Sequence, residues 1–309
     1  MGGSGRSSTF FTSSPADLQR QIRDSELEFA YANFGPHLAQ WLNSLLADVN
    51  DRDDQRTQSR LDQIRAVLKD ELEDSFDLRF GGSVSKHTFV DGLSDIDILL
   101  VLGSSTKKML PNTLLNQIAS ELADKLPRDI EVSKGRIAVT MKYSDGEEIQ
   151  IIPSVRAVGR LHVPAWDTNE WSKINPEKFK RGLTKRNDEC GGKLIPTIKL
   201  AKAINDSLPE NRKLTGYHIE SLAISSFKNY AGKCVVEKML PFFFQKMAIL
   251  VKKPIKDSTG QSVHVDQYLG RSNSSERQQL AHILDRIARR MENATAGASL
   301  DQWKALFNG

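Results

Sequence analysis

Residues 80–102 read FGGSVSKHTFVDGLSDIDILLVL, a glycine-serine turn followed by two aspartates that lead into an apolar run. Side chains alternate between the two faces of a β-strand, so Asp95 and Asp97 should share one face while Ile96 and Ile98 point into a core. Mg²⁺ prefers oxygen ligands and is commonly held by a few carboxylates together with a substrate's phosphates. The stretch therefore predicts a strand that presents a metal-binding pair of carboxylates.

The turn before this strand is suited to bind phosphate. Gly82 and Ser83 let backbone N–H groups and a hydroxyl approach an anion closely, and the residues from Val84 onward can begin a helix whose N-terminus favours negative charge. A glycine-serine turn or an Asp-x-Asp pair alone is usually an ordinary turn or a solvated strand entrance. Because the two occur close together, directly before a hydrophobic strand, we interpret them as one site.

The composition is that of a soluble globular protein. The chain has 309 residues, of which 39% are hydrophobic, enough for one large or two ordinary cores. The apolar runs are too short to span a membrane and the N-terminus lacks the apolar region of a signal peptide, so we expect a cytoplasmic protein without membrane contact. Cys190 and Cys234 form no zinc pattern and should remain reduced thiols.

The net charge is small, and the basic residues are dispersed along the sequence. The net charge is +4, and the basic pairs at 107–108, 252–253 and 289–290 are far apart in the sequence. Proteins that follow a nucleic-acid backbone usually show a denser basic stripe. This balance suits a small anionic substrate at least as well.

The pattern of elements predicts an α+β fold with two lobes. Residues 1–15, rich in Gly, Ser and Thr, should be flexible. Residues 16–160 should form a mixed-sheet lobe with two N-terminal helices, the first kinked at Gly35-Pro36, and residues 161–309 an all-helical lobe. Strands are expected at 76–80, 95–102, 130–133, 136–143 and 147–152, and later helices at 111–126, 176–188, 193–207, 216–230, 235–250, 274–291 and 300–307. A cleft between two such lobes is the usual place for a ligand.

A third carboxylate can come from the strand at 147–152. Two-metal phosphoryl transfer clamps the attacking and leaving oxygens between two ions that neighbouring carboxylates hold. Glu148 and Gln150 share one face of this strand, and Ile149 and Ile151 share the other. Glu148 is therefore the candidate to join the aspartate pair, the alternative being an exposed charge of the hairpin.

The helix at 193–207 offers cations for a triphosphate. Lys199 and Lys202 lie three residues apart, although lysines on helices are usually solvated. Next along the chain, Gly216 and Tyr217 lie where a loop enters a helix. Tyr217 can stack on a nucleobase or be an ordinary core aromatic. His218 has no His or Cys partner at ligand spacing, so we interpret it as structural.

These motifs, in this order, resemble the polymerase-β-like nucleotidyltransferases, and within them the bacterial cGAS/DncV-like nucleotidyltransferases (CD-NTases) of CBASS anti-phage systems. The motifs that carry the resemblance are Gly82-Ser83, the strand from Ser94 to Asp97, Ile151-Ile152-Pro153, Ile198–Lys202, Thr215–Glu220, Asp257–Gly260 and Trp303–Phe307. The resemblance implies a polymerase-β-like fold in which Ser83 contacts donor phosphates, and Asp95 and Asp97 bind Mg²⁺ or Mn²⁺. It also implies that Lys202, with Lys199, holds the triphosphate and that Tyr217 stacks on a base.

One position departs from the family pattern. The family's third metal aspartate generally lies three residues before the strand-ending proline, Pro153, and this chain has Gln150 there. A neutral amide is a weak substitute for a carboxylate on a hard cation. Either Glu148 supplies the missing charge or the chain is a weakened or inactive member, and the intact remainder of the site favours Glu148.

The resemblance implies that the chain makes a cyclic oligonucleotide second messenger from NTPs, with ATP expected among them, for anti-phage signalling. A ribose hydroxyl would attack an α-phosphate in line, and the product would act on a separate effector. The terminal Gly309 is compatible with conjugation by a CBASS accessory protein. The alternatives are a template-independent enzyme that adds nucleotides to RNA ends and a non-catalytic nucleotide sensor. The modest charge argues against the first, so nucleic-acid binding is not expected to be required.

Overall fold

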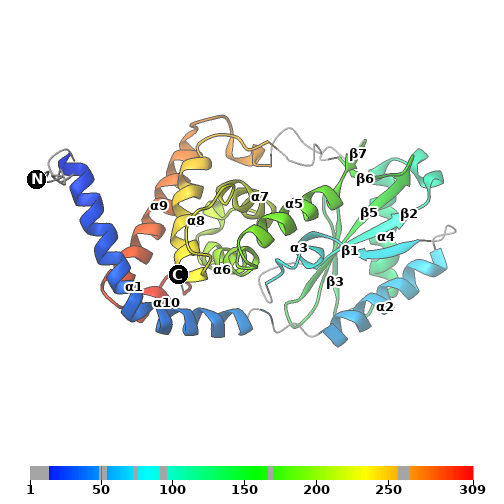
Figure 1. Cartoon of the computed structure of the whole chain (residues 1–309). Coiled ribbons are helices and arrows are strands. Elements are labelled where there is room, and N and C mark those ends of the chain that lie inside the picture. Colours follow the sequence, from blue (N-terminus) through cyan, green and yellow to red (C-terminus); the bar gives the residue numbers. More distant parts are fainter. Residues whose placement is uncertain are drawn as a thin grey trace, which may run out of the picture.

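The computed structural model describes residues 14–48, 50, 54–71, 76–90, 96–165, 170–256 and 265–308. Asp95, the loop at 257–260 and Gly309, together with most of the N-terminal segment, lie outside the described residues. Within them the chain forms two lobes, a helical one and one built on a sheet, at opposite ends of an elongated molecule (Figure 1). Among the described residues, no helix is both long and apolar enough to cross a membrane.

The described strands form one mixed sheet. They are β1 (Asp77–Phe80), β2 (Ile96–Leu102), β3 (Glu131–Lys134), β4 (Val139–Lys142), β5 (Glu148–Ala157), β6 (Arg160–Pro164) and β7 (Trp171–Ile174). The strand order is β1-β2-β5-β4-β3, with β6 paired to β5 and β7 paired to β6. The central strands β2 and β5 run parallel, and the other pairs of described strands are antiparallel. The predicted α+β fold is confirmed.

One face of the sheet is buried under two helices, α2 (Asp54–Glu71) and α4 (Pro111–Lys125). Ile96 and Ile98 of β2 and Ile149 of β5 are buried in this core. Complete burial of such a side chain contributes about 1.5–3 kcal/mol. Because side chains alternate, Asp97 and Gln150 lie on the opposite face, where they are half-buried. The helix-covered core thus fixes which side chains face away from it.

The sheet is longer than the sequence predicted. We expected the last strand to end at residue 152 and a helical lobe from residue 161, but β5, β6 and β7 continue the sheet to Ile174. The expected boundary at 160 falls inside the sheet and is wrong there. The turn between β5 and β6 is Val158-Gly159, and both residues have positive φ. This is the conformation of a two-residue hairpin turn, which Asn-Gly or Asp-Gly usually signals and Val-Gly does not.

The helical lobe has a core of its own. It contains α5 (Pro176–Glu189), α6 (Leu194–Asp206), α7 (Gly216–Ser226), α8 (Val236–Leu250), α9 (Ser275–Ala296) and α10 (Leu300–Lys304). Short helical turns complete the described elements: α3 (Gly82–Ser85), η2 (Ser104–Lys108), η3 (Glu210–Arg212) and η4 (Gln267–Leu269). Each predicted helix after residue 176 is found, and α7 ends at Ser226 rather than near Tyr230.

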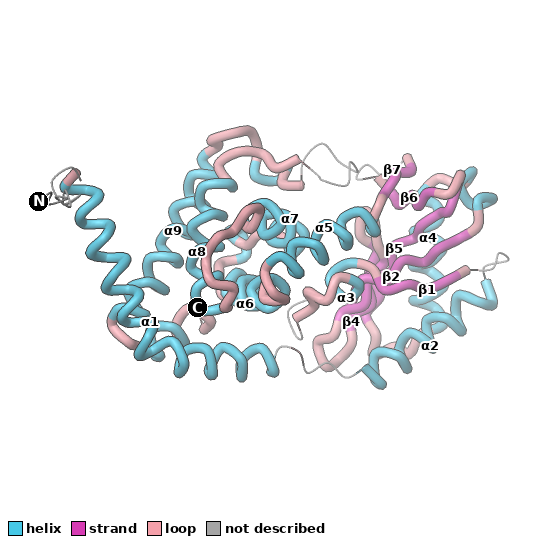
Figure 2. The backbone as a smooth tube through the Cα atoms, viewed as in Figure 1, coloured by secondary structure: helices cyan, strands magenta, loops and turns pink. Residues whose placement is uncertain are grey.

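The first helix, α1 (Pro15–Asp48), packs on the helical lobe and not on the sheet. Phe34, Leu38 and Leu42 are buried in the helical core, so our assignment of α1 to the sheet lobe is wrong. Pro36 lies inside the helix, and α1 bends between its two halves (Figures 1 and 2). Proline removes one backbone hydrogen bond and crowds the preceding turn, which explains the predicted kink.

Candidate active site

A cavity of about 1200 Å³ lies between the lobes and brings together most of the predicted site residues. The sheet lobe lines it with the glycine-serine turn and with β2 and β5, and the helical lobe lines it with α6 and α7. The predicted residues in its lining are Gly82, Ser83, Asp97, Glu148, Lys202, Gly216 and Tyr217. Residues more than a hundred positions apart in the sequence therefore face one space.

The glycine turn is tied directly to β2 at Asp97. The Gly81 N–H donates to the carbonyl oxygen of Asp97 at 2.7 Å. Gly82 has a φ of +40°, and a β-carbon there would lie 1.5 Å from Oδ2 of Asp97. Both the backbone conformation and the space require glycine at this position. Ser83 follows, buried in the first turn of α3, so the turn, the hydroxyl and the carboxylate form one compact unit.

Gln150 is the direct strand neighbour of Asp97. The two residues are register partners in the parallel pairing of β2 with β5. Glu148 lies two residues earlier on the same face, which places its Cα about 6–7 Å further along the strand. Its Oε1 is 3.0 Å from Nζ of Lys142, and Glu148 also lines the cavity. A third metal ligand at Glu148 stays a prediction, and the position next to Asp97 carries an amide.

Some of the donors that the predicted metal site requires lie among the described residues. Asp97 presents a carboxylate to the cavity beside the glycine turn, and Glu148 contributes a second carboxylate to the same lining. These are the hard oxygen donors that Mg²⁺ prefers. Asp95, the remaining predicted ligand, lies outside the described ranges, and within those ranges no three His, Cys, Asp or Glu side chains are grouped closely enough to hold a metal. The donors present fit the ion, and the complete ligand set remains a prediction.

A buried ion network links the glycine-serine segment to the helical lobe. Nζ of Lys202 lies 2.9 Å from Oε1 of Glu220 and donates to the carbonyl oxygen of Thr88 at 2.9 Å. The other carboxylate oxygen of Glu220 is paired with Lys86, and the Thr88 hydroxyl donates to Glu220. Glu220 is only 1% exposed. One carboxylate therefore holds α6, α7 and the segment after α3 together.

The network fixes the charges of its members. Burial alone would raise the pKa of Glu220, but Lys86 and Lys202 outweigh it and bring this pKa below its usual value. Burial lowers the pKa of Lys202, and Glu220 opposes that shift. Two cations share one carboxylate, so the network keeps excess positive charge at the wall of the cavity. Such charge suits the oxygens of a bound triphosphate.

Tyr217 lies in an aromatic and cationic corner of the cavity. Its ring centroid is 4.8 Å from that of Phe179, with the planes tilted by 40°. Nζ of Lys86 lies 5.4 Å from the Tyr217 centroid and 5.0 Å from the Phe179 centroid, within cation–π range. Thr215 caps α7 by accepting the N–H of His218 and so fixes the turn that carries Tyr217. Base stacking by Tyr217 stays a prediction.

Lys199 lies away from the other predicted residues. Its ammonium donates to the side-chain oxygen of Asn50, and it is not part of the described lining of the cavity. Burial lowers its pKa, and the nearby Lys202 adds to that shift. The structure thus separates the two lysines that we expected to act on one ligand, and triphosphate binding by Lys199 stays a prediction.

Lys86, Phe179 and Glu220 are cavity residues that sequence reasoning did not single out. Lys86 lies four residues after Gly82, and Glu220 ends the Thr215–Glu220 motif, but residue type and spacing alone indicate no role for either. A buried Glu and a buried Lys on neighbouring helices cannot be paired from spacing, because their partnership depends on the packing of α6 against α7. Phe179 belongs to an amphipathic helix, where an aromatic residue is the ordinary filling of a core.

His218 belongs to a separate buried polar cluster behind α7. Its Nδ1 is 2.8 Å from the Tyr268 hydroxyl, and its Nε2 is 3.6 Å from Oδ2 of Asp266. The guanidinium of Arg277 reaches the same Asp266 oxygen at 2.7 Å. Burial lowers the pKa of His218 to about 4, an effect that Asp266 opposes and Arg277 reinforces. Within this cluster His218 is neutral at physiological pH.

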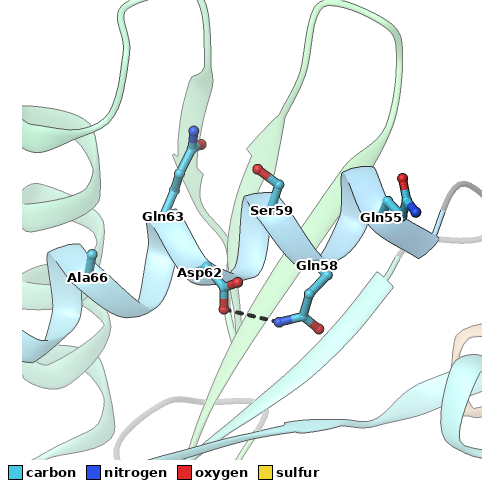
Figure 3. Close-up of a pocket in the computed structure, with 6 residues that line it drawn as sticks. All are labelled: Gln55, Gln58, Ser59, Asp62, Gln63 and Ala66. Atoms are coloured by element: carbon cyan, nitrogen blue, oxygen red, sulfur yellow. Dashed lines mark hydrogen bonds between the residues drawn. The ribbon is translucent and has the colours of Figure 1, made fainter.

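A second hollow, on α2, has a different character. Figure 3 shows its six lining side chains on one helix. They are Gln55, Gln58, Ser59, Asp62, Gln63 and Ala66. The amide of Gln58 donates to Asp62 at 3.0 Å, and Asp62 is the single charged residue of this described lining. This lining offers no cation for a phosphate and one carboxylate for a metal, so the inter-lobe cavity is the candidate active site.

Comparison with known proteins relates most of the sheet lobe to a known domain family. Residues 37–187 match the family model of the Second Messenger Oligonucleotide or Dinucleotide Synthetase domain. The match assigns residues 37–187 to this domain family. The matched segment contains the glycine turn, β2 and β5, which are the parts of the sheet lobe that line the cavity. The resemblance predicted from the sequence is confirmed, and no curated protein matches this sequence significantly.

Solved structures show the same fold. CdnC of E. coli MS115-1 with ATP is 15% identical, has a TM-score of 0.60 and covers 83% of this chain and 92% of its own. CdnG of Bradyrhizobium diazoefficiens with GTP is 13% identical and has a TM-score of 0.63, and the match covers 87% of this chain and 98% of CdnG. The cyclic AMP-GMP synthase DncV of Vibrio cholerae, solved with a linear intermediate, is 11% identical and has a TM-score of 0.63. The match covers 95% of this chain and 88% of DncV. At these identities the likeness establishes the CD-NTase fold.

Proposed function

We propose that this chain joins nucleoside triphosphates into a cyclic oligonucleotide second messenger. The observation that carries the proposal is the contact of the Gly82 backbone with the Asp97 carboxylate in a cavity that Lys86, Lys202 and Tyr217 also line. The domain match and the fold support synthesis of oligonucleotide second messengers in general. The cavity adds a phosphate-binding turn, a carboxylate, cations and an aromatic ring, which are the groups that such a reaction requires.

In each step a ribose hydroxyl oxygen bonds to an α-phosphorus, the bond to the β-phosphate oxygen breaks, and pyrophosphate leaves while the hydroxyl proton passes to solvent. Asp97 would hold Mg²⁺ or Mn²⁺, with Asp95 and Glu148 as the further ligands. When bound, the ion lowers the cost of forming the alkoxide and neutralises the leaving group. Ser83 and the turn would bind phosphate oxygens, and Tyr217 would orient a base by stacking.

The finer biological assignment is CBASS anti-phage signalling in the cytoplasm. The product would activate a separate effector, so no direct contact with that effector is required. The E. coli CdnC has also been solved in a complex with HORMA-deltaN, which supports an accessory protein for a chain of this fold. Conjugation through Gly309 is the form of partnership that we propose, and mass spectrometry of cells that carry the whole operon would detect a Gly309-linked adduct.

The deciding experiment is incubation of the full chain with all four NTPs and Mg²⁺ or Mn²⁺, without RNA. Chromatography and mass spectrometry of phosphatase-resistant products should show a cyclic oligonucleotide. Asp97→Asn should abolish the product and leave the melting temperature nearly unchanged, since the two side chains have the same shape. Full product from Asp97→Asn would overturn the proposed role of the carboxylate.

Gln150 gives one rival function a specific basis. An amide beside Asp97 weakens a carboxylate metal site, so a nucleotide sensor would bind ATP and release no pyrophosphate. Calorimetric binding of ATP with no product under any of the metal conditions would favour the sensor. An enzyme that extends RNA ends would differ from both, because its product would appear only when RNA is added.

A further inference from the structure

A second groove continues from the candidate active site along the same face of the sheet. It has a volume of about 580 Å³ and is lined by β1, β2, β5, β6, β7 and the start of α5. Gly81, Ser85, Leu99, Ile174 and Pro176 line both this groove and the inter-lobe cavity. The two hollows are therefore neighbours on one surface, and a ligand chain in one can extend into the other.

The groove gathers cations that are dispersed in the sequence. Its described lining contains six basic side chains and one carboxylate, that of Glu177. The six are Arg79, Arg156, Arg160, Lys173, Lys178 and Lys180. The whole chain has a net charge of only +4, so this one groove concentrates more positive charge than the average of the molecule. The cluster could not be predicted from the sequence, because two of the strands that carry it, β6 and β7, were not predicted.

Among the described residues, one of these six cations has an acidic partner. Arg79 pairs with Asp77, whose Oδ2 lies 2.6 Å from Nε of Arg79. The other five make no ion pair with any residue in the part of the chain that the structure describes. Ordinary solvated surfaces mix charges of both signs, whereas a hollow lined by one sign focuses its field and attracts counter-ions. The groove is thus built to receive an anion.

The cations are spread along the groove and do not converge on one point. Arg156 and Arg160 flank the turn between β5 and β6, Lys173 lies in β7, and Lys180 is a full turn into α5. Phe80 lines the same groove and is 37% exposed. A positively charged groove with an aromatic side chain is the arrangement by which proteins bind single-stranded nucleic acid. A compact anion such as free phosphate would use only one or two of these side chains.

We propose that this groove binds the phosphodiester backbone of a single-stranded oligonucleotide whose one end points toward the candidate active site. The inference concerns binding alone and does not depend on the proposed synthesis. The ligand is held through its phosphates, so binding is tolerant of sequence and sensitive to salt. A linear intermediate made in the neighbouring cavity and cellular RNA share this phosphodiester chemistry, and competition by unlabelled strands of different length separates the two sources.

The test uses the full chain and a fluorescein-labelled oligouridylate of about ten nucleotides, within the size that single-strand grooves cover. Fluorescence anisotropy without NTPs or metal should show binding that weakens as salt rises. Arg156→Glu with Arg160→Glu should weaken binding at least ~10-fold and reduce the salt slope by about 1–2. Lys252→Glu with Lys253→Glu is the matched control, because these exposed lysines lie outside the groove and change the net charge equally. Thermal melting should show that both variants remain folded.

Equal weakening in the two double variants, or no binding by the unmodified chain at low salt, would overturn the proposal. Unlabelled duplex RNA that displaces the probe better than single strands at equal phosphate concentration would overturn the single-strand assignment. An unlabelled linear dinucleotide that competes per phosphate as well as a ten-nucleotide strand identifies a short linear intermediate as the source, and stronger competition by the longer strand identifies RNA. The NTP assay on the Arg156→Glu, Arg160→Glu variant is read separately, so failure of synthesis cannot be mistaken for failure of binding.

Discussion

The carboxylate of Asp97 fills the space beside Gly82 in which any other residue would place its β-carbon. Both residues come from the same short stretch of sequence, and a backbone hydrogen bond from Gly81 to Asp97 joins the turn to the strand at this point. The position of the carboxylate in the cavity therefore depends on the turn. A substitution in the turn should therefore displace the Asp97 carboxylate and impair its function.

Gly82→Ala should abolish nucleotide turnover. The added β-carbon would lie 1.5 Å from Oδ2 of Asp97, so the carboxylate must move out of its position. Its φ of +40° is also unfavourable for alanine, by about 1–2 kcal/mol. Product formation from NTPs would be measured beside the free energy of unfolding in urea. We expect product to fall by at least ~100-fold with a modest loss of stability.

Gly192→Ala separates the collision from the backbone strain. Gly192 has a φ of +77° and nothing within 4 Å of the position of an added β-carbon. Its alanine variant should lose a similar amount of stability and keep its turnover. If both variants lose turnover equally, the contact between residue 82 and Asp97 is not the cause.

Glu220→Gln should destabilise the fold and weaken nucleotide binding. Loss of the carboxylate leaves Lys202, 7% exposed, as a buried cation without the counter-charge to which it is hydrogen-bonded. Removal of one partner of a buried pair typically costs about 3–5 kcal/mol, and the hydrogen bonds that glutamine retains should hold the loss to the lower end. The measurements are urea unfolding and calorimetric binding of ATP.

The matched control is Glu210→Gln, which also changes a carboxylate at the cavity wall. Its side chain is 90% exposed and pairs with Lys213 at 3.2 Å. An exposed pair contributes about 0–1 kcal/mol, so this variant should unfold almost as the unmodified chain does. Equal unfolding curves for the two variants would show that Glu220 does not stabilise the network.

Glu148→Ala and Gln150→Ala should have unequal effects on turnover. If Glu148 supplies the third carboxylate, its removal should lower product formation by at least ~10-fold, while Gln150→Ala changes a neutral side chain and should be milder. Turnover would be measured over a range of Mg²⁺ and Mn²⁺ concentrations, because loss of a metal ligand raises the metal concentration required. Loss of turnover in Gln150→Ala alone would show that the strand neighbour of Asp97 is the functional residue.

Much of the sheet lobe could be predicted because residues close together in the sequence determine its strands and its glycine turn. The alternation of Ile96, Asp97 and Ile98 defines which face of β2 is buried, and the same reasoning places Glu148 and Gln150 together on β5. The turn at Gly82 could be recognised from residue type. What could not be predicted depends on partners distant in the sequence, as in the pairing of Lys202 with Glu220.

The differences between the predicted and the observed structure have the same origin. β6 and β7 are short strands joined to the sheet by pairing, and the Val158-Gly159 turn lacks the usual hairpin signal. The amphipathic pattern of α1 predicts a buried face but not which lobe buries it. Lys199 and Lys202 share a helix, yet one contacts Asn50 and the other Glu220, because a spacing of three residues separates their directions by about 60°.

The groups around the buried His218 ring explain its lowered pKa. The Tyr268 hydroxyl accepts the Thr215 N–H at 3.3 Å, so its own proton is available to Nδ1 of His218. Nε2 lies 3.6 Å from Oδ2 of Asp266, beyond hydrogen-bond distance, and that oxygen is paired with Arg277. A proton added to this buried ring would bring a positive charge out of water beside an Asp266 carboxylate that Arg277 already pairs. This arrangement opposes protonation, in agreement with the lowered pKa.

The free energy of unfolding should therefore fall as the pH falls from about 6.5 to about 4. The pKa of His218 is lowered from 6.5 to about 4 in the folded chain. Between these values the unfolded chain binds a proton that the folded chain does not, which lowers stability by up to about 3 kcal/mol. His218→Asn keeps an acceptor for Tyr268 and has no titrating ring, so its unfolding should depend less on pH in this window. Urea unfolding of both proteins at several pH values measures the difference, and parallel pH profiles would show that His218 does not set this dependence.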